Sequence, residues 1–378
     1  MNYHDSPEEA EFRAALRRWL AGNIPGDEPP EGDEEARATF LSAWHRRLYA
    51  GGWLGLTWPV EAGGRGLSPI YEGIFNEELG AANAPSPPGN IGFLGKAIIG
   101  FGSPEQQKRY LPTLLKGEER WCQGFSEPGA GSDLGSLRTR ADLDGDHYVV
   151  NGQKVWTSFA KWADWCLLLA RTDQEAPKHK GISALVLRMD SPGVSVRPIH
   201  QIDHSNDLAE VFFDDVQVPV DQLIGAPGQG WSIAMRTLAY ERGPADIGFI
   251  ARARRRLHQL ETEAGRGAFG DDPAVGVRLA QCYVHIEMLR LHVLRSLSQR
   301  VAQGEPGSEG SADKLLWTLA EQELSRLALD LAGVSPILGD DLAPLHEYFQ
   351  SRAVSIYGGS AQIQRSIIAQ RVLGMPRS

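Results

Sequence analysis

One stretch near the end of the first third of the chain limits the fold more than any other. It reads Trp121-Cys-Gln-Gly-Phe-Ser-Glu-Pro-Gly-Ala-Gly-Ser-Asp-Leu-Gly-Ser136. Phe125-Ser126 has the character of a strand end, and Pro128 stops regular pairing because it has no N–H to donate. Gly129-Ala-Gly131 has little side-chain bulk, so its backbone N–H groups could approach a flat or phosphorylated ligand closely. Ser132-Asp133 adds a hydroxyl and a carboxylate. A polar surface turn has the same composition, so composition alone leaves both interpretations open.

A second segment follows, Asn151-Gly-Gln-Lys-Val-Trp-Thr-Ser158. The two stretches, in this order and at this spacing, resemble the two flavin segments of the acyl-CoA dehydrogenase family. The chain ends with Ile356-Tyr-Gly-Gly-Ser-Ala-Gln-Ile-Gln-Arg365 and then Arg371-Val-Leu-Gly374, which is similar to the closing motif of that family. The resemblance covers essentially the whole chain.

The bulk composition is that of an ordinary globular protein. The chain has 378 residues, of which 42% are hydrophobic and 23% charged, so two or three domains are expected and disorder is not. A formal net charge of −10 argues against a protein that binds nucleic acid or an anionic membrane. It leaves room for a coenzyme A site, because a local basic cluster is enough to bind phosphates.

The cysteines and the N-terminus indicate a compartment. Cys122, Cys166 and Cys282 lie far apart and have no metal or redox spacing, which fits buried thiols in a reducing environment. The first residues are acidic and contain no apolar run, so no signal peptide is expected. The longest apolar stretch, near Trp165–Ala170, is too short to cross a bilayer. A soluble, cytoplasmic protein is the expectation.

The order of predicted elements is helical, then β, then helical. Together with the family resemblance, this order of elements implies an α+β multidomain fold. We expect an N-terminal helical domain over residues 1–120, an antiparallel, barrel-like β domain over 121–226, and a C-terminal four-helix bundle over 227–378. The predicted strands are short, apolar and separated by turn residues, at 146–153, 164–171, 182–189 and 208–218.

Individual helix boundaries also follow from local sequence. Ser6-Pro7 is placed to cap and begin the first helix, and Gly243-Pro244 should kink or break a long helix that begins near Ser232. Ser311 is placed to cap a helix over 312–332, which Gly333 ends.

The resemblance implies an enzyme that removes hydrogens from the α and β carbons of an acyl-CoA thioester and uses FAD. A carboxylate takes the α proton, and donors polarise the thioester carbonyl. The residues that match the family's flavin contacts are Gln123, Phe125, Ser126, Gly131, Ser132, Trp156 and Ser158. Ser126 and Ser158 stand where the family more often has threonine, and Ser132 also matches a coenzyme A contact. For Trp156, simple core packing is the alternative.

The catalytic base is where this sequence departs from many family members. They place a glutamate at the position of Gly358, and glycine has no group that accepts a proton. A second lineage carries the glutamate on a C-terminal-domain helix just before an arginine, and Glu241-Arg242 matches that site. The resemblance therefore implies Glu241 as base, with Arg242 and Tyr357 contacting substrate and the Gly358 N–H polarising the thioester. The alternative for Glu241 is an exposed helix residue that pairs locally.

Features that the family supplies to a neighbouring subunit are less distinct. Arg266 with Phe269-Gly270 corresponds to a flavin contact across the dimer, but the spacing that follows is short. Leu331–Pro336 only weakly resembles the family's glycine-rich loop. A dimer or tetramer is expected, with identical or unlike chains. The basic run at 252–256 is either a solvated helix face or a phosphate or subunit contact. No set of ligands indicates a metal.

The function implied is FAD-dependent oxidation of an acyl-CoA to the trans-2-enoyl-CoA, with electrons passed to an electron-transfer flavoprotein. One alternative is a flavin monooxygenase or oxidase on the same scaffold. Another is a partner subunit that shares a flavin site in a hetero-oligomer. Glu241, Arg242 and Ser132 favour the dehydrogenase, because a monooxygenase need not keep a coenzyme A site.

Overall fold

The computed structural model describes residues 4–26, 29, 33–87, 91–240, 244–266, 272–304, 307–339 and 341–376. The chain forms two compact units, and each is built from segments distant in sequence. One, the helical unit, contains Met1–Ile24, Leu67–Ser86 and Arg242–Ser378. The other, the sheet unit, contains Pro25–Gly66 and Pro87–Glu241. The division into three domains at residues 120 and 226 stays a prediction.

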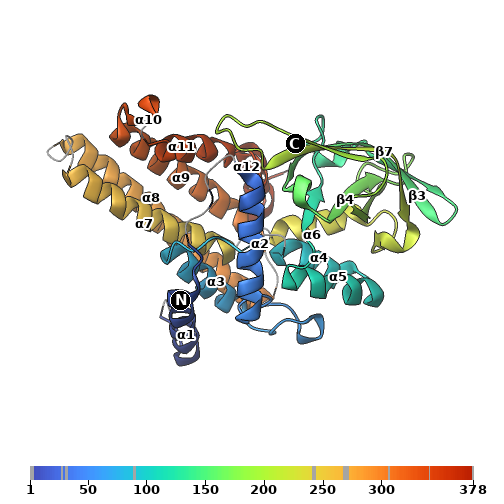
Figure 1. Cartoon of the computed structure of the whole chain (residues 1–378), viewed down its shortest axis with the longest axis horizontal. Coiled ribbons are helices and arrows are strands. Elements are labelled where there is room, and N and C mark those ends of the chain that lie inside the picture. Colours follow the sequence, from blue (N-terminus) through green and yellow to red (C-terminus); the bar gives the residue numbers. More distant parts are fainter. Residues whose placement is uncertain are drawn as a thin grey trace. The chain divides into compact units, whose positions relative to one another are not determined.

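The sheet unit is organised around one eight-stranded sheet (Figure 1). Its strands are β1 (Trp121–Gly124), β2 (Arg140–Asp144), β3 (His147–Ser158), β4 (Trp165–Arg171), β5 (Ile182–Arg188), β6 (Val194–Pro198), β7 (Leu208–Pro219) and β8 (Leu223–Ile224). The strand order is β6-β7-β3-β2-β4-β5-β8, and β1 pairs with β4. Most neighbours are antiparallel, as predicted, but β1 and β2 both run parallel to β4.

Burial explains which strands lie at the centre of the sheet unit. β4 and β5 are buried along six successive residues each, so both of their faces are covered, and their sequences are nearly continuous apolar runs. β7 alternates buried and half-buried residues along its first half, the pattern of a strand with one face in a core. The core between them includes Leu168, Leu185 and Val211.

Four helices accompany the strands in the described part of the sheet unit. They are α2 (Glu34–Ala50), α4 (Lys96–Phe101), α5 (Pro104–Lys116) and α6 (Gly230–Tyr240). Of these, α5 and α6 contact the strands directly. Tyr110 of α5 contacts Trp121 and Trp165 edge to face, with ring centroids 5.3 and 5.2 Å away. Gln106 donates hydrogen bonds to the carbonyls of Asp221 and Leu223. These contacts fix α5 against the strands on which the first flavin-like segment begins.

The helical unit consists of packed helices. They are α1 (Pro7–Asn23), α3 (Pro69–Ala81), α7 (Pro244–Arg266), α8 (Pro273–Gln303), α9 (Gly310–Ala332), α10 (Ser335–Leu338), α11 (Ala343–Ala353) and α12 (Ala361–Ile367). Their apolar stripes form a core that includes Leu257, Leu289 and Leu327. α3 and α7 approach closely, because a Cβ at Gly80 would lie 2.3 Å from the Gly248 carbonyl oxygen.

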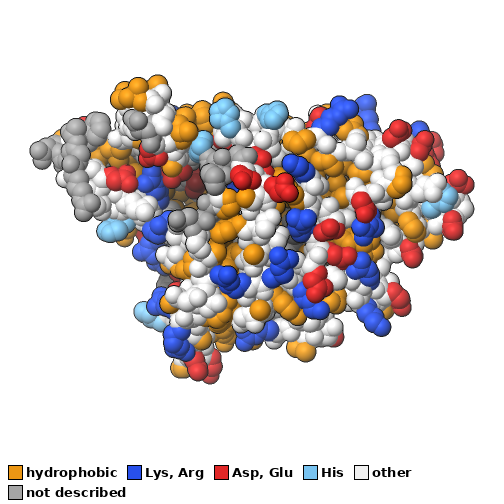
Figure 2. All heavy atoms as spheres, viewed as in Figure 1, with side chains coloured by type: hydrophobic (Ala, Val, Ile, Leu, Met, Phe, Trp, Pro, Cys, Tyr) orange, Lys and Arg blue, Asp and Glu red, His pale blue; other side chains and the backbone are white. Residues whose placement is uncertain are grey.

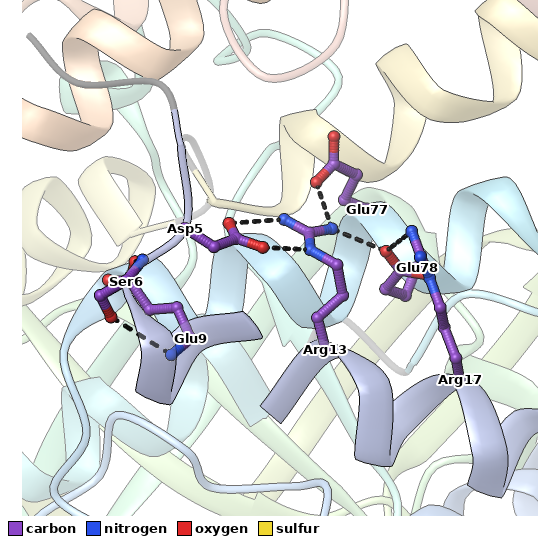
Figure 3. Close-up of polar contacts among 7 residues, drawn as sticks. All are labelled: Asp5, Ser6, Glu9, Arg13, Arg17, Glu77 and Glu78. Carbon is purple, nitrogen blue, oxygen red and sulfur yellow. Dashed lines mark hydrogen bonds and ion pairs between the residues drawn. The ribbon is translucent and has the colours of Figure 1, made fainter. Parts of the chain in front are cut away.

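A charged network joins α1 to α3 within the helical unit (Figure 3). The Arg13 guanidinium contacts Asp5 at 2.6 Å, Glu77 at 2.7 Å and Glu78 at 2.6 Å. Arg17 donates two hydrogen bonds to the Glu78 carboxylate, at 2.6 and 2.8 Å. The Glu78 side chain is only 5% exposed, so its two arginine partners offset the cost of burying its charge.

The predicted fold class is confirmed, and the boundaries show where local rules succeed. Ser6 caps α1 in a capping box with Glu9. The predicted break at Gly243-Pro244 stays a prediction, because residues 241–243 lie outside the described part of the chain. The prediction that Ser311 is a cap was wrong. α9 begins at Gly310, so Ser311 lies inside the helix, buried, and its hydroxyl has no partner among the described residues.

Across the described residues, no helix is long and apolar enough to span a membrane, and no group of side chains could hold a metal ion.

Candidate functional site

A β-bulge in β3 turns the aromatic residue of the second segment outward. The ladder between β3 and β7 shifts register between Lys154 and Thr157, and Trp156 within that shift has φ +60°. Lys154 and Val155 are consecutive buried residues, which a regular strand with alternating faces does not produce. The Trp156 side chain is consequently 58% exposed. Core packing, the alternative interpretation of Trp156, is wrong.

The glycine-rich loop of the first segment is open at its tip. Glu127 and Ala130 exchange two backbone hydrogen bonds, at 3.1 and 3.0 Å, which close a tight turn. A Cβ added at Gly129 or Gly131 would meet no atom within 4 Å among the described residues. Ser132 is exposed beside them. The loop thus presents backbone and a hydroxyl to a ligand.

The far side of this loop is anchored. Lys178 donates to both carboxylate oxygens of Asp133, at 2.8 and 2.6 Å, and its hydrogen bond is the main reason that the pKa of Asp133 is lowered. Arg171 donates to the carbonyls of Gly135 and Leu137, at 3.0 and 3.3 Å. The open tip of the loop is therefore held between the Glu127–Ala130 turn and the segment from Asp133 to Leu137, which Lys178 and Arg171 bind.

The structure joins the two predicted segments directly. The Val155 N–H donates to the Ser126 carbonyl at 2.9 Å, one residue from Trp156. Gln123 and Ser126 are half-buried and Ser158 is exposed. The Phe125 ring is buried, so a cofactor contact there would fall to its main chain. All seven predicted flavin-lining residues lie in the sheet unit.

The closing motif forms a glycine turn in the helical unit. Gly358 and Gly359 have φ of +63° and +92°, and Gln364 donates to both of their carbonyls at 3.0 and 3.1 Å. The Tyr357 ring and the Trp317 ring each lie 4.2 Å from the Lys314 ammonium. Sequence analysis did not single out Lys314 and Trp317. Their i,i+3 spacing places both on one face of α9, but nothing in the local sequence links that face to Tyr357.

Three predicted site residues cannot be placed in full. Glu241 and Arg242 lie outside the described residues, as does Phe269-Gly270. Arg266 is the last residue of α7, and its side chain is outside the description. Leu331–Pro336 spans the end of α9, capped by Gly333, and the start of α10.

The basic run at 252–256 makes contacts within its own unit. Arg252 donates to the Ala84 carbonyl at 3.1 Å, and Arg255 donates to the Asn83 side chain. Arg256 pairs with Glu347 at 3.1 Å, and Arg254 pairs with Glu287 at 3.1 Å. These arginines therefore hold helices together, which neither predicted interpretation included.

The arrangement in the sheet unit fits a flavin. An outward indole, a loop without side-chain bulk and nearby hydroxyls could bind a flat ring system and its phosphates.

The sequence matches three family models along nearly its whole length. They are described as "Acyl-CoA dehydrogenase, N-terminal domain" over residues 6–118, "middle domain" over 122–216 and "C-terminal domain" over 228–373. The chain belongs to the acyl-CoA dehydrogenase family. It is an oxidoreductase of that class, and FAD is its cofactor.

Individual proteins of the family resemble this chain over nearly its whole length. The chain is 43% identical to "Acyl-CoA dehydrogenase IpdE1" of Mycobacterium tuberculosis over 97% of this chain and 98% of that one. Its structure is similar to that of "Tcur3481-Tcur3483 steroid ACAD", with a TM-score of 0.87, 31% identity and full coverage of both chains. It is also similar to a chain of the ChsE4-ChsE5 complex from Mycobacterium tuberculosis, with a TM-score of 0.85, 32% identity and full coverage of both chains.

Proposed function

We propose that this protein oxidises an acyl-CoA thioester to the trans-2-enoyl-CoA with Glu241 as the base. The observation that carries the proposal is the pairing of an open glycine-rich loop with the outward Trp156, joined by the Val155–Ser126 hydrogen bond. Gly358, where many family members have the base, offers no carboxylate.

The reaction requires a proton and a hydride equivalent to leave adjacent carbons. The α C–H bond breaks as its proton passes to the Glu241 carboxylate, and its electron pair forms the new C=C bond as the β hydrogen leaves with its own pair. FAD, when bound, supplies the acceptor for that hydride equivalent. The Gly358 N–H polarises the thioester carbonyl, which acidifies the α proton. Arg242, Ser132 and Tyr357 hold the substrate.

Substitution of Glu241 tests this assignment. Glu241→Gln keeps size and hydrogen bonding but accepts no proton, so it should retain FAD and acyl-CoA binding. Its rate of anaerobic flavin reduction should fall by about 100- to 10,000-fold. Glu61→Gln, at an exposed position in the sheet unit, is the matched control and should leave the rate unchanged. Near-normal reduction of the Glu241→Gln flavin by its best substrate would overturn the assignment.

The substrate is inferred to be a bulky acyl-CoA. One observation supports this: a structural neighbour at 31% identity is described as a steroid ACAD. The family lineage that the Glu241-Arg242 motif resembles is also compatible with branched or bulky acyl groups. We infer that an electron-transfer flavoprotein accepts the electrons, as the family resemblance implies. Rates with straight-chain, branched and steroid-side-chain CoA thioesters would rank the substrates.

Assembly into an oligomer is also inferred. An exposed apolar tip is made by Val334, which precedes α10, and by Ile337 and Leu338 of α10; they are 67%, 83% and 70% exposed, and Figure 2 shows hydrophobic side chains gathered there. Apolar side chains this exposed commonly mark an interface. The ChsE4-ChsE5 structure is a complex of two differently named chains, which supports an unlike partner here as an alternative to a homo-oligomer.

A further inference from the structure

A buried lysine connects the two segments that are assigned to the flavin. Lys154 belongs to the second segment, and its side chain is 0% exposed. Its ammonium donates to the Phe125 carbonyl at 3.0 Å and to the Glu127 carboxylate at 2.8 Å. Both acceptors belong to the first segment. A lysine is almost never this buried unless it is paired, so the contact indicates a specific requirement at this place.

The carboxylate partner extends the connection. Glu127, which is 8% exposed, accepts hydrogen bonds from the backbone N–H groups of Arg138 at 2.6 Å and Thr139 at 2.8 Å. Glu127 also belongs to the turn with Ala130. One ion pair therefore ties the base of the glycine-rich loop to its exit and to β3.

The fit around the lysine is close. A Cβ added at Gly124 would lie 2.9 Å from the Cys166 sulfur and 3.5 Å from the Lys154 Cγ, so the stem runs beside a position where a larger side chain has no room. Burial lowers the pKa of Lys154 to about 8, while Glu127 opposes that shift. The charged ammonium therefore remains the main form of Lys154 at neutral pH. The Phe125 carbonyl and the Glu127 carboxylate, which accept its hydrogen bonds, fix where the ammonium points.

We propose that Lys154 is a positioning residue for the flavin site, because its ammonium fixes the distance between the glycine-rich loop and the bulge that carries Trp156. The inference rests on the proposed role of both segments in binding FAD. The lysine does not need to touch the cofactor. It acts through the Phe125 carbonyl and the Glu127 turn, and through Val155, which precedes Trp156 and bonds to Ser126.

Three variants separate positioning from simple stability. Lys154→Met keeps the length of the side chain without its charge, Glu127→Gln removes the other charge, and a double variant carries both. Each apoprotein is titrated with FAD by flavin fluorescence, its thermal unfolding is recorded, and the circular dichroism of bound flavin reports its environment. Glu78→Gln, in the buried pair of the helical unit, is the control for lost stability alone.

We expect Lys154→Met to bind FAD about tenfold or more weakly, with an altered flavin dichroism band. The double variant should regain thermal stability, because no unpaired charge stays buried, but not FAD affinity or the band shape, because methionine and glutamine do not replace the ammonium bridge. Glu78→Gln should lose stability and keep both. If Lys154→Met fails to fold, the double variant carries the same test.

Two results would overturn the inference. One is FAD affinity and dichroism close to wild type in Lys154→Met or, where that variant does not fold, in the double variant. The other is full recovery of affinity and dichroism together with stability in the double variant. Failure of the wild-type protein, with its partner, to bind FAD would instead contradict the proposed function itself.

Discussion

A methyl group added at Gly131 should weaken FAD binding without harming the fold. The structure leaves the space around this position open, because an added Cβ would meet no described atom within 4 Å. Neither Gly131 nor Gly129 has left-handed backbone, so alanine is tolerated at both and could even stabilise the protein slightly. Any loss in Gly131→Ala must then come from a ligand that approaches the backbone.

The expected size follows from the cost of overfilling a close contact, about 1–3 kcal/mol. That cost corresponds to about 5- to 150-fold weaker FAD binding, measured by fluorescence titration of the apoprotein. Gly26→Ala is the matched control, equally open and in the same unit but outside the glycine-rich loop, and should bind FAD like wild type. Wild-type affinity in Gly131→Ala, or a large fall in its melting temperature, would refute the reasoning.

Three further predictions concern stability and assembly. Glu78→Gln should lower the free energy of unfolding by about 2–4 kcal/mol in urea titrations, whereas the more exposed Glu77→Gln should cost under about 1 kcal/mol; equal effects would contradict the network described here. Burial opposes ionisation of Glu119, but hydrogen bonds from Arg109 and Thr113 lower its pKa to about 2. Since this pKa is below the ordinary 4.5, the pair stabilises the fold above pH 4.5 and that stability is lost toward pH 2, by about 2 kcal/mol after screening. The free energy of unfolding of Glu119→Gln, measured in urea, should lack this pH dependence. An unchanged pH dependence would contradict the role of the Glu119 carboxylate. Light scattering with flavin quantitation should show an oligomer; a monomer with full FAD occupancy would contradict a shared site.

Local sequence rules predicted much of this fold because the relevant interactions are local. Ser6 caps α1 through a bond to a residue three positions away, and Pro7 fits the first turn of the helix because its missing N–H is not needed there. The short, leucine-rich run that forms β4 is predicted as a strand because turn residues bound it on both sides. The prediction that Ser311 caps a helix was wrong because α9 begins one residue earlier, at Gly310. A serine before an apolar stretch does not show whether the helix extends further toward the N-terminus.

Non-local pairing set the limit of prediction. Nothing in Trp121–Gly124 indicates that it pairs parallel with β4, because the register depends on chain more than forty residues away. The bulge at Trp156 and the burial of Lys154 were equally hidden, since a lysine in a strand is ordinarily expected to face solvent. The candidate flavin residues came from ordered motifs, whereas the ion pair that holds those motifs together emerged only from the structure.

The most direct test of the account is an anaerobic titration of the purified protein, with its partner if one is needed, against a panel of acyl-CoA thioesters. The account predicts bleaching of the flavin by at least one thioester, with formation of a 2-enoyl-CoA two hydrogens poorer than the substrate and with fast reoxidation by an electron-transfer flavoprotein. A flavin that no acyl-CoA reduces, or turnover that consumes oxygen and yields a hydroxylated product, would contradict it.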